Sequence, residues 1–95
     1  MPGYVIANVN VTDPSVFEEY RGMVPATIAA YGGKYLVRGG SADVVEGDWS
    51  PNRLVVIEFE SVEKAKEWYN SPEYTAAKAV RLRASTGDLL FVDGI

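Results

Sequence analysis

Four segments of the chain have the residue pattern of β-strands, because they are short, rich in β-branched and aromatic residues, and bounded by turn-forming residues. The four predicted strands are residues 4–11, 34–38, 53–59 and 89–92. The first alternates with a period of two, and its fully apolar face consists of Val5, Ala7, Val9 and Val11. The third is the most apolar run in the chain, which predicts a central strand.

A period of three to four residues predicts a helix after the first strand. Thr12-Asp13-Pro14 offers an N-cap followed by proline at the first helical position, and Gly32-Gly33 ends the helix. The predicted inward stripe consists of Phe17, Tyr20, Val24, Thr27, Ile28 and Tyr31. Pro25 lies inside this span, and we expect it to kink the helix.

Two more helical stretches follow the third strand. Ser61 is the predicted cap of the first, and Ser71 with Pro72 begins the second, which runs to about Arg83. The aromatic residues expected to pack this second helical layer against the sheet or its neighbours are Trp68, Tyr69 and Tyr74. A small basic group is interpreted as solvated surface, and it consists of Lys78, Arg81 and Arg83.

The resulting order is strand, helix, strand, strand, helix pair, strand. Such a βαββαβ order contains two split β-α-β units and predicts an α+β fold, with a four-stranded antiparallel sheet and helices on one face. The length of 95 residues fits one core, so we predict a single domain over residues 1–95.

The segment between the second and third strands is rich in glycine. Gly39-Gly40 is interpreted as a β-bulge that bends the strand, in preference to a place where a ligand approaches the backbone. Residues 41–46 either continue the strand or form a short edge piece, and 47–52 form a loop. Trp49 in this loop is predicted to anchor an interface, and the alternative is a rim residue over a cavity.

Both faces of the predicted central strand are largely apolar. Alternation places two sets of residues on opposite sides, namely Arg53, Val55, Ile57 and Phe59 on one and Leu54, Val56 and Glu58 on the other. Helices cover only one of these faces, and an exposed apolar sheet face marks an interface or a ligand groove. We therefore predict a homodimer in which two sheets face each other across a two-fold axis and enclose a cavity.

Three polar side chains are predicted to line that cavity from the uncovered face. Asn8, Arg38 and Glu58 each fall among the apolar residues of that face when the strands alternate regularly. Arg38 is able to bind a carboxylate or carbonyl oxygen of a small ligand through its guanidinium N–H groups. Glu58 is a candidate base if burial in the cavity removes its hydration. The binding set is therefore Asn8, Arg38, Glu58 and Trp49.

A purely structural interpretation of the same residues stays open at this point. Arg38 and Glu58 are equally suited to pair across neighbouring strands and fix their register. Asn8 is equally suited to satisfy a backbone group at a strand end.

Composition narrows the chemistry further. The chain contains neither cysteine nor histidine. Their absence excludes thiolate nucleophiles, Ser-His-Asp relays, disulfides, zinc sites of the Cys/His type and His-ligated haem. Any general acid or base must then be a carboxylate, tyrosine or lysine, and we expect neither a metal nor a tightly held cofactor.

Charge and hydropathy limit the partners. A formal net charge of −4 argues against nucleic acid, because binding to phosphates needs clustered cations. No apolar run approaches the ~20 residues of a membrane helix. No basic segment followed by a long apolar stretch precedes the first strand, so we expect a cytoplasmic protein.

Several motifs together resemble domain-of-unknown-function family 1330. They are Asp13-Pro14, Tyr31-Gly32-Gly33-Lys34, Arg38-Gly39-Gly40, Glu46-Gly47-Asp48-Trp49, residues 53–59 and Trp68-Tyr69-Asn70-Ser71-Pro72-Glu73-Tyr74. The resemblance covers nearly the whole chain. It implies a dimeric α+β barrel in the ferredoxin-like group and no agreed reaction. Wider relatives of that barrel include cofactor-independent monooxygenases and muconolactone isomerase-like proteins, as well as haem proteins whose histidine ligand has no counterpart here.

Two hypotheses for function follow. In the first, the protein is a cofactor-independent enzyme, an isomerase or monooxygenase-like protein, in which Arg38 orients a small anionic or carbonyl-containing substrate and Glu58 moves a proton. In the second, the protein is a non-catalytic, dimeric ligand-binding or stress-associated module, in which Arg38 and Asn8 fix the ligand.

Overall fold

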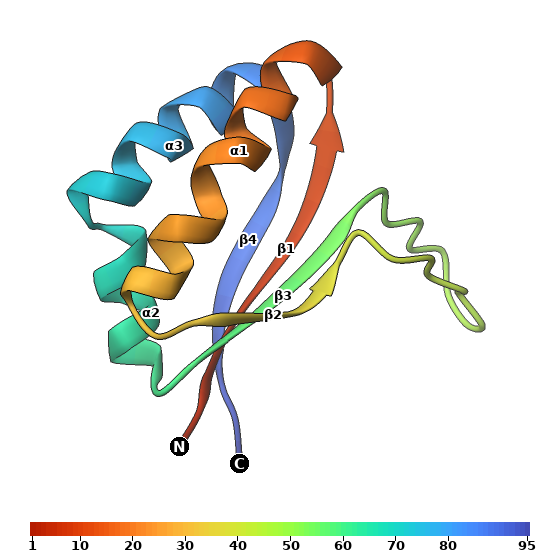
Figure 1. The fold of residues 1–95 in the computed structure, drawn as a ribbon. Helices are drawn as coiled ribbons and strands as arrows, with labels where there is room; N and C mark the ends of the chain where they lie inside the picture. The colour runs from red at the N-terminus through yellow and green to blue at the C-terminus, as the bar shows by residue number, and fades with distance from the viewer.

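The protein is an antiparallel four-stranded sheet with three helices on one face (Figure 1). The computed structural model describes residues 1–95. Its elements are β1 (Gly3–Val11), α1 (Pro14–Ala30), β2 (Lys34–Arg38), β3 (Leu54–Phe59), α2 (Val62–Tyr69), α3 (Pro72–Ala84) and β4 (Ser85–Asp93). The strands lie in the order β2-β3-β1-β4. The predicted α+β class and βαββαβ order are confirmed.

Each helix begins at a side-chain cap that was predicted from the sequence. Asp13 Oδ1 accepts a hydrogen bond from the Val16 backbone N–H at 3.3 Å, and Ser61 Oγ accepts one from Lys64 N–H at 3.1 Å. Ser71 Oγ does the same for Tyr74 N–H at 3.1 Å. These bonds satisfy backbone donors that have no partner within the first helical turn.

The core lies between the helices and the sheet. Its largest fully buried side chains are Trp68, Tyr74, Phe59 and Val5. The Trp68 indole N–H donates to Thr27 Oγ1 at 3.0 Å, so its one polar group is satisfied within the core. Trp68 packs against Phe59 of β3, and Tyr74 packs against Tyr20 and Trp68 of the neighbouring helices, which confirms the predicted packing of these two residues.

A β-bulge in β2 changes which side chains face the helices. Tyr35 pairs with Ile57 on β3, whereas Val37 pairs with Val56, so Leu36 is an additional residue on β2. An extra residue reverses the alternation beyond it. Tyr35 and Arg38 consequently share the helix-facing side.

The predicted position of this bulge, at Gly39-Gly40, is wrong. β2 has already ended at Arg38, and Gly39 follows it with φ +74°, a conformation that favours glycine. Residues 41–46 also form no strand, because β3 begins only at Leu54 and leaves them without a partner. The whole segment projects from the sheet as a loop (Figure 1).

The face of the sheet that the helices leave uncovered is largely apolar. Ile6, Leu54 and Val56 are partly exposed on its two central strands. On the edge strands Val37, Leu90 and Val92 are 39%, 50% and 40% exposed. The predicted apolar character of both faces is confirmed.

None of the helices is both long and apolar enough to cross a membrane.

Candidate functional site

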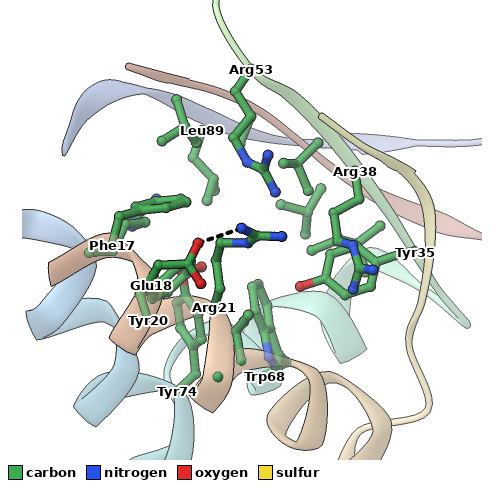
Figure 2. Close-up of a pocket in the computed structure, with 18 residues that line it drawn as sticks. Phe17, Glu18, Tyr20, Arg21, Tyr35, Arg38, Arg53, Trp68, Tyr74 and Leu89 are labelled. Carbon is green, nitrogen blue, oxygen red and sulfur yellow. Dashed lines mark hydrogen bonds and ion pairs between the residues drawn. The ribbon is translucent and has the colours of Figure 1, made fainter. Parts of the chain in front are cut away.

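A cavity of about 360 Å³ lies between the helical layer and the sheet (Figure 2). The sheet contributes an apolar floor that includes Ala7, Val9 and Val55. Phe17 and Val24 of α1 and the buried Trp68 of α2 form apolar walls. Small-molecule sites are typically of this size and combine apolar walls with a few polar groups.

The polar groups of the cavity are mainly arginines. The chain has five arginines, and four of them line this one space: Arg21, Arg38, Arg53 and Arg81. The only acidic lining residue is Glu18, which pairs with Arg21 at 2.6 Å. A protein with a net charge of −4 thus surrounds its cavity with an excess of positive charge. Such a field attracts anions.

Aromatic rings position two of these guanidinium groups. The Arg38 guanidinium carbon lies 5.0 Å from the centre of the Tyr35 ring, and that of Arg53 lies 5.7 Å from the Phe17 ring. Arginine stacks favourably on aromatic faces and keeps its N–H groups free at the edge of the plane. Figure 2 shows both side chains extending from the strands into the cavity.

Two hydroxyl groups meet on the helical side of the cavity. Tyr20 of α1 and Tyr74 of α3 are hydrogen-bonded to each other at 3.0 Å between their oxygens. Burial raises the pKa of Tyr20 and of Tyr74 above the usual value, and the Arg81 guanidinium partly opposes the rise at both. The two tyrosines therefore stay protonated at neutral pH and act as neutral hydrogen-bonding groups.

A third hydroxyl comes from the sheet. Tyr35 directs its oxygen towards the centre of the cavity (Figure 2). Burial raises its pKa, while Arg38, Arg53 and Arg21 lower it. Its hydroxyl is thus a protonated donor with three guanidinium groups in its surroundings, an arrangement suited to an oxyanion.

The predicted convergence of Asn8, Arg38 and Glu58 on the uncovered face is wrong, because the bulge at Leu36 turns Arg38 to the helix side. Asn8 and Glu58 do lie on the uncovered face, where Asn8 is opposite Leu54 and Glu58 is opposite Tyr4. Arg38 alone of the three lines the cavity. The alternative that Arg38 and Glu58 pair with each other is wrong for the same reason.

Asn8 and Glu58 have structural partners on their own face. Glu58 accepts a hydrogen bond from the Tyr4 hydroxyl at 3.2 Å and pairs with Lys34 at 3.3 Å. Asn8 Oδ1 accepts from the Asn52 backbone N–H at 3.0 Å, which ties the end of the long loop to β1. The structural interpretation of Asn8, in which it satisfies a backbone group, is confirmed.

Trp49 does not line the cavity. It lies in the projecting loop and its side chain is 59% exposed. Its two predicted roles, an interface anchor and a rim residue over a cavity between two subunits, both stay predictions.

Residue spacing alone indicates the inward position of three of the cavity arginines. Arg81 follows Tyr74 by seven residues, which places both on one face of α3. The interpretation of Arg81 as solvated surface, which considered only its charge, is therefore wrong. Arg21 follows Phe17 by four residues on α1 in the same way. Arg53 belongs to the helix-facing set of β3 by simple alternation. The position of Tyr35 and Arg38 had no such signal, because the bulge is not visible in the residue types.

The motifs of the chain are those of a known family. The family model described as domain of unknown function DUF1330 matches residues 2–95. The chain belongs to this family. The comparison with curated proteins found no match.

Solved structures share the fold. A protein of unknown function from Rhodopseudomonas palustris superposes with a TM-score of 0.78 at 18% identity, over 99% of this chain and 82% of that one. SnoaB, a cofactor-independent oxygenase from Streptomyces nogalater, has a TM-score of 0.65 at 11% identity, over 99% and 93%. A putative antibiotic biosynthesis monooxygenase from Nitrosomonas europaea has a TM-score of 0.65 at 17% identity, over 100% and 99%. The shared architecture is the ferredoxin-like fold of dimeric α+β barrels.

Proposed function

We propose that this protein binds a small organic anion in the cavity between its helices and its sheet. The observation that carries the proposal is the gathering of four arginines around a mainly apolar space in an acidic protein. The apolar walls suit a hydrocarbon or aromatic body, and the guanidinium groups suit a carboxylate or another oxyanion. Arg38 keeps the role of anion-binding residue that the sequence suggested, on the opposite face of the sheet.

A thermal-shift screen of small acids tests this proposal. Benzoate, phenylacetate, hexanoate and 2-oxo acids should raise the melting temperature, since a ligand at ten times its Kd stabilises the folded state by about 1.4 kcal/mol. Arg38→Ala should abolish the shift. Arg83→Ala is the matched control, because Arg83 is exposed on α3 and does not line the cavity. A shift that persists in Arg38→Ala would count against the proposal.

We also propose that the protein is a homodimer that pairs through the uncovered sheet face. That face presents apolar side chains from all four strands, including Ile6, Val37, Val56 and Leu90. Its ion pair, Lys34 with Glu58, is already satisfied within one chain, so a second copy finds no unpaired charge at that position. The fold shared with dimeric α+β barrels supports the same arrangement.

A second candidate function is cofactor-independent catalysis at the same cavity. Protonated tyrosine hydroxyls and guanidinium groups are suited to stabilise an enolate that forms when a proton beside a carbonyl is removed. Glu18 is the only carboxylate that lines the cavity, and it is a candidate base when a ligand competes for Arg21. Likeness in fold to SnoaB, described as a cofactor-independent oxygenase, fits this class of chemistry.

Exchange of solvent deuterium into 2-oxo acids, followed by NMR, measures such proton abstraction directly. The protein should accelerate exchange, and Glu18→Gln should slow it at least tenfold, whereas its exposed neighbour Glu19→Gln should not. Glu58→Gln tests the base that the sequence suggested. An effect of Glu58→Gln without an effect of Glu18→Gln would move the chemistry to the uncovered face.

A further inference from the structure

The guanidinium groups of the cavity form two sets. Arg21, Arg38 and Arg53 belong to the set near Tyr35, whose pKa all three lower against the effect of burial. Arg81 has this effect on Tyr20 and Tyr74 instead. Arg38 ends β2, Arg53 directly precedes β3 and Arg21 lies on α1, whereas Arg81 lies on α3.

The first set lies at the solvent side of the cavity. Arg38 is exposed, and the Arg21 side chain is 48% exposed. Tyr35 directs a hydroxyl into the space beside them (Figure 2). An oxyanion at this place would accept hydrogen bonds from the hydroxyl and from guanidinium N–H groups together.

The second set lies among buried side chains. Tyr74 is 0% exposed, and its hydroxyl is bonded to that of Tyr20. Arg81 Nε is buried and has no hydrogen-bond partner, the only such side-chain atom in the protein. A buried charged donor without an acceptor is costly, so its presence calls for an acceptor that the chain itself does not supply.

Apolar side chains make up most of the remaining cavity lining. Val55 and Leu89 of the sheet and Phe17 of α1 line the cavity without offering any polar side-chain group. A ligand with one charged end would use only one set and leave the other without an acceptor. A ligand with an oxyanion at each end of an apolar spacer would satisfy both.

We propose that the cavity takes an organic diacid, with one oxyanion near Tyr35, Arg38 and Arg53 and the other at Arg81. This inference deepens the proposed function and rests on it. The site can also accommodate the charge of a dianion, since four guanidinium groups and the single carboxylate of Glu18 leave an excess of three positive charges.

Calorimetric titration with pairs of acids of equal carbon number tests the inference. The probes are hexanoate with hexanedioate, octanoate with octanedioate, and decanoate with decanedioate. We expect at least one diacid to bind tenfold or more tightly than its monoacid. Arg81→Met should remove this advantage and leave the monoacid affinity within about threefold. Arg83→Met, two residues further along α3 and outside the cavity, should leave both affinities unchanged.

Each outcome decides between the two proposals. Equal binding of monoacids and diacids by the wild type, or a diacid advantage that survives Arg81→Met, overturns the two-ended site while the proposed function stands. Absence of binding by every acid overturns the proposed function itself. Should Arg81→Met fail to fold, Arg81→Lys keeps the charge and removes Nε, and it should reduce the diacid advantage at least threefold.

Discussion

Single side chains in the cavity depend on neighbours that a sequence pattern does not reveal. Arg38 is positioned by the Tyr35 ring, and Arg81 lies near Tyr20 and Tyr74, whose pKa values it lowers against the effect of burial. Alternation and helical spacing do predict which face each residue occupies, and they did so for Trp68 and Tyr74. These patterns do not show whether an arginine can occupy an inward face. An inward arginine needs a cavity for its side chain, and several elements together form that cavity.

The buried tyrosines predict a specific dependence of stability on pH. Burial raises the pKa of Tyr20, Tyr35 and Tyr74 above the unfolded value of about 10. The folded state then keeps these protons where the unfolded chain loses them. Their stabilisation is complete below pH 10 and is lost as the pH rises through the folded-state values. Each hydroxyl contributes a fall of up to about 1.4 kcal/mol per pH unit.

Urea unfolding between pH 8 and pH 11 measures this slope. The free energy of unfolding should fall above pH 10 in the wild type, and Tyr20→Phe should fall less steeply because one such hydroxyl is missing. Identical slopes in both proteins would show that Tyr20 does not keep its proton. Absorbance near 295 nm provides an independent count of the tyrosines that ionise late in the folded protein.

Among the elements, helices were more predictable than strands. Each helix has a cap and a proline or glycine boundary that acts within a few residues, so Asp13, Ser61 and Ser71 marked the starts correctly. The strand β2 was predicted with the correct bounds but with the wrong face for Arg38, because the extra residue at Leu36 arises from pairing with β3. The register between strands that are far apart in the sequence cannot be predicted from the local residue pattern.

The close pairing of β1 with β4 depends on one glycine. Gly87 has φ +145°, and a Cβ atom there would lie 2.0 Å from the Asn8 carbonyl oxygen, so alanine cannot be accommodated without moving a strand. We expect Gly87→Ala to lower the free energy of unfolding by at least about 2 kcal/mol. Gly40→Ala, where a Cβ would meet nothing within 4 Å, should change it by less than about 0.5 kcal/mol. Chemical denaturation gives both values, and equal effects would contradict the contact.

For the whole molecule, the sequence predicted the class, the single sheet and the apolar uncovered face, because these follow from periodicity summed over many residues. It did not predict that the cavity of a single chain lies beneath α1. That position depends on how the helices pack over the sheet, and Phe17, Tyr20 and Trp68 from two helices line the space that this packing leaves. The cavity is thus a property of the packed layers.

The homodimer is the prediction that belongs to this scale. Light scattering at micromolar concentration should give about twice the mass of one chain. Val56→Lys places a charge in the middle of the uncovered face and should give a monomer, because an unpaired charge is costly to bury. Ala76→Lys, on the exposed side of α3, should leave the dimer intact. A monomeric wild type would contradict pairing through the sheet.

Binding of an anion by the cavity arginines is the central claim, and NMR of the arginine Nε–H groups tests it most directly. During titration with benzoate and with hexanoate, the signals of Arg38 and Arg53 should move and saturate together, while that of the exposed Arg83 should stay in place. Signals that do not move, or an Arg83 signal that moves in step with the others, would show that these acids do not bind in the cavity.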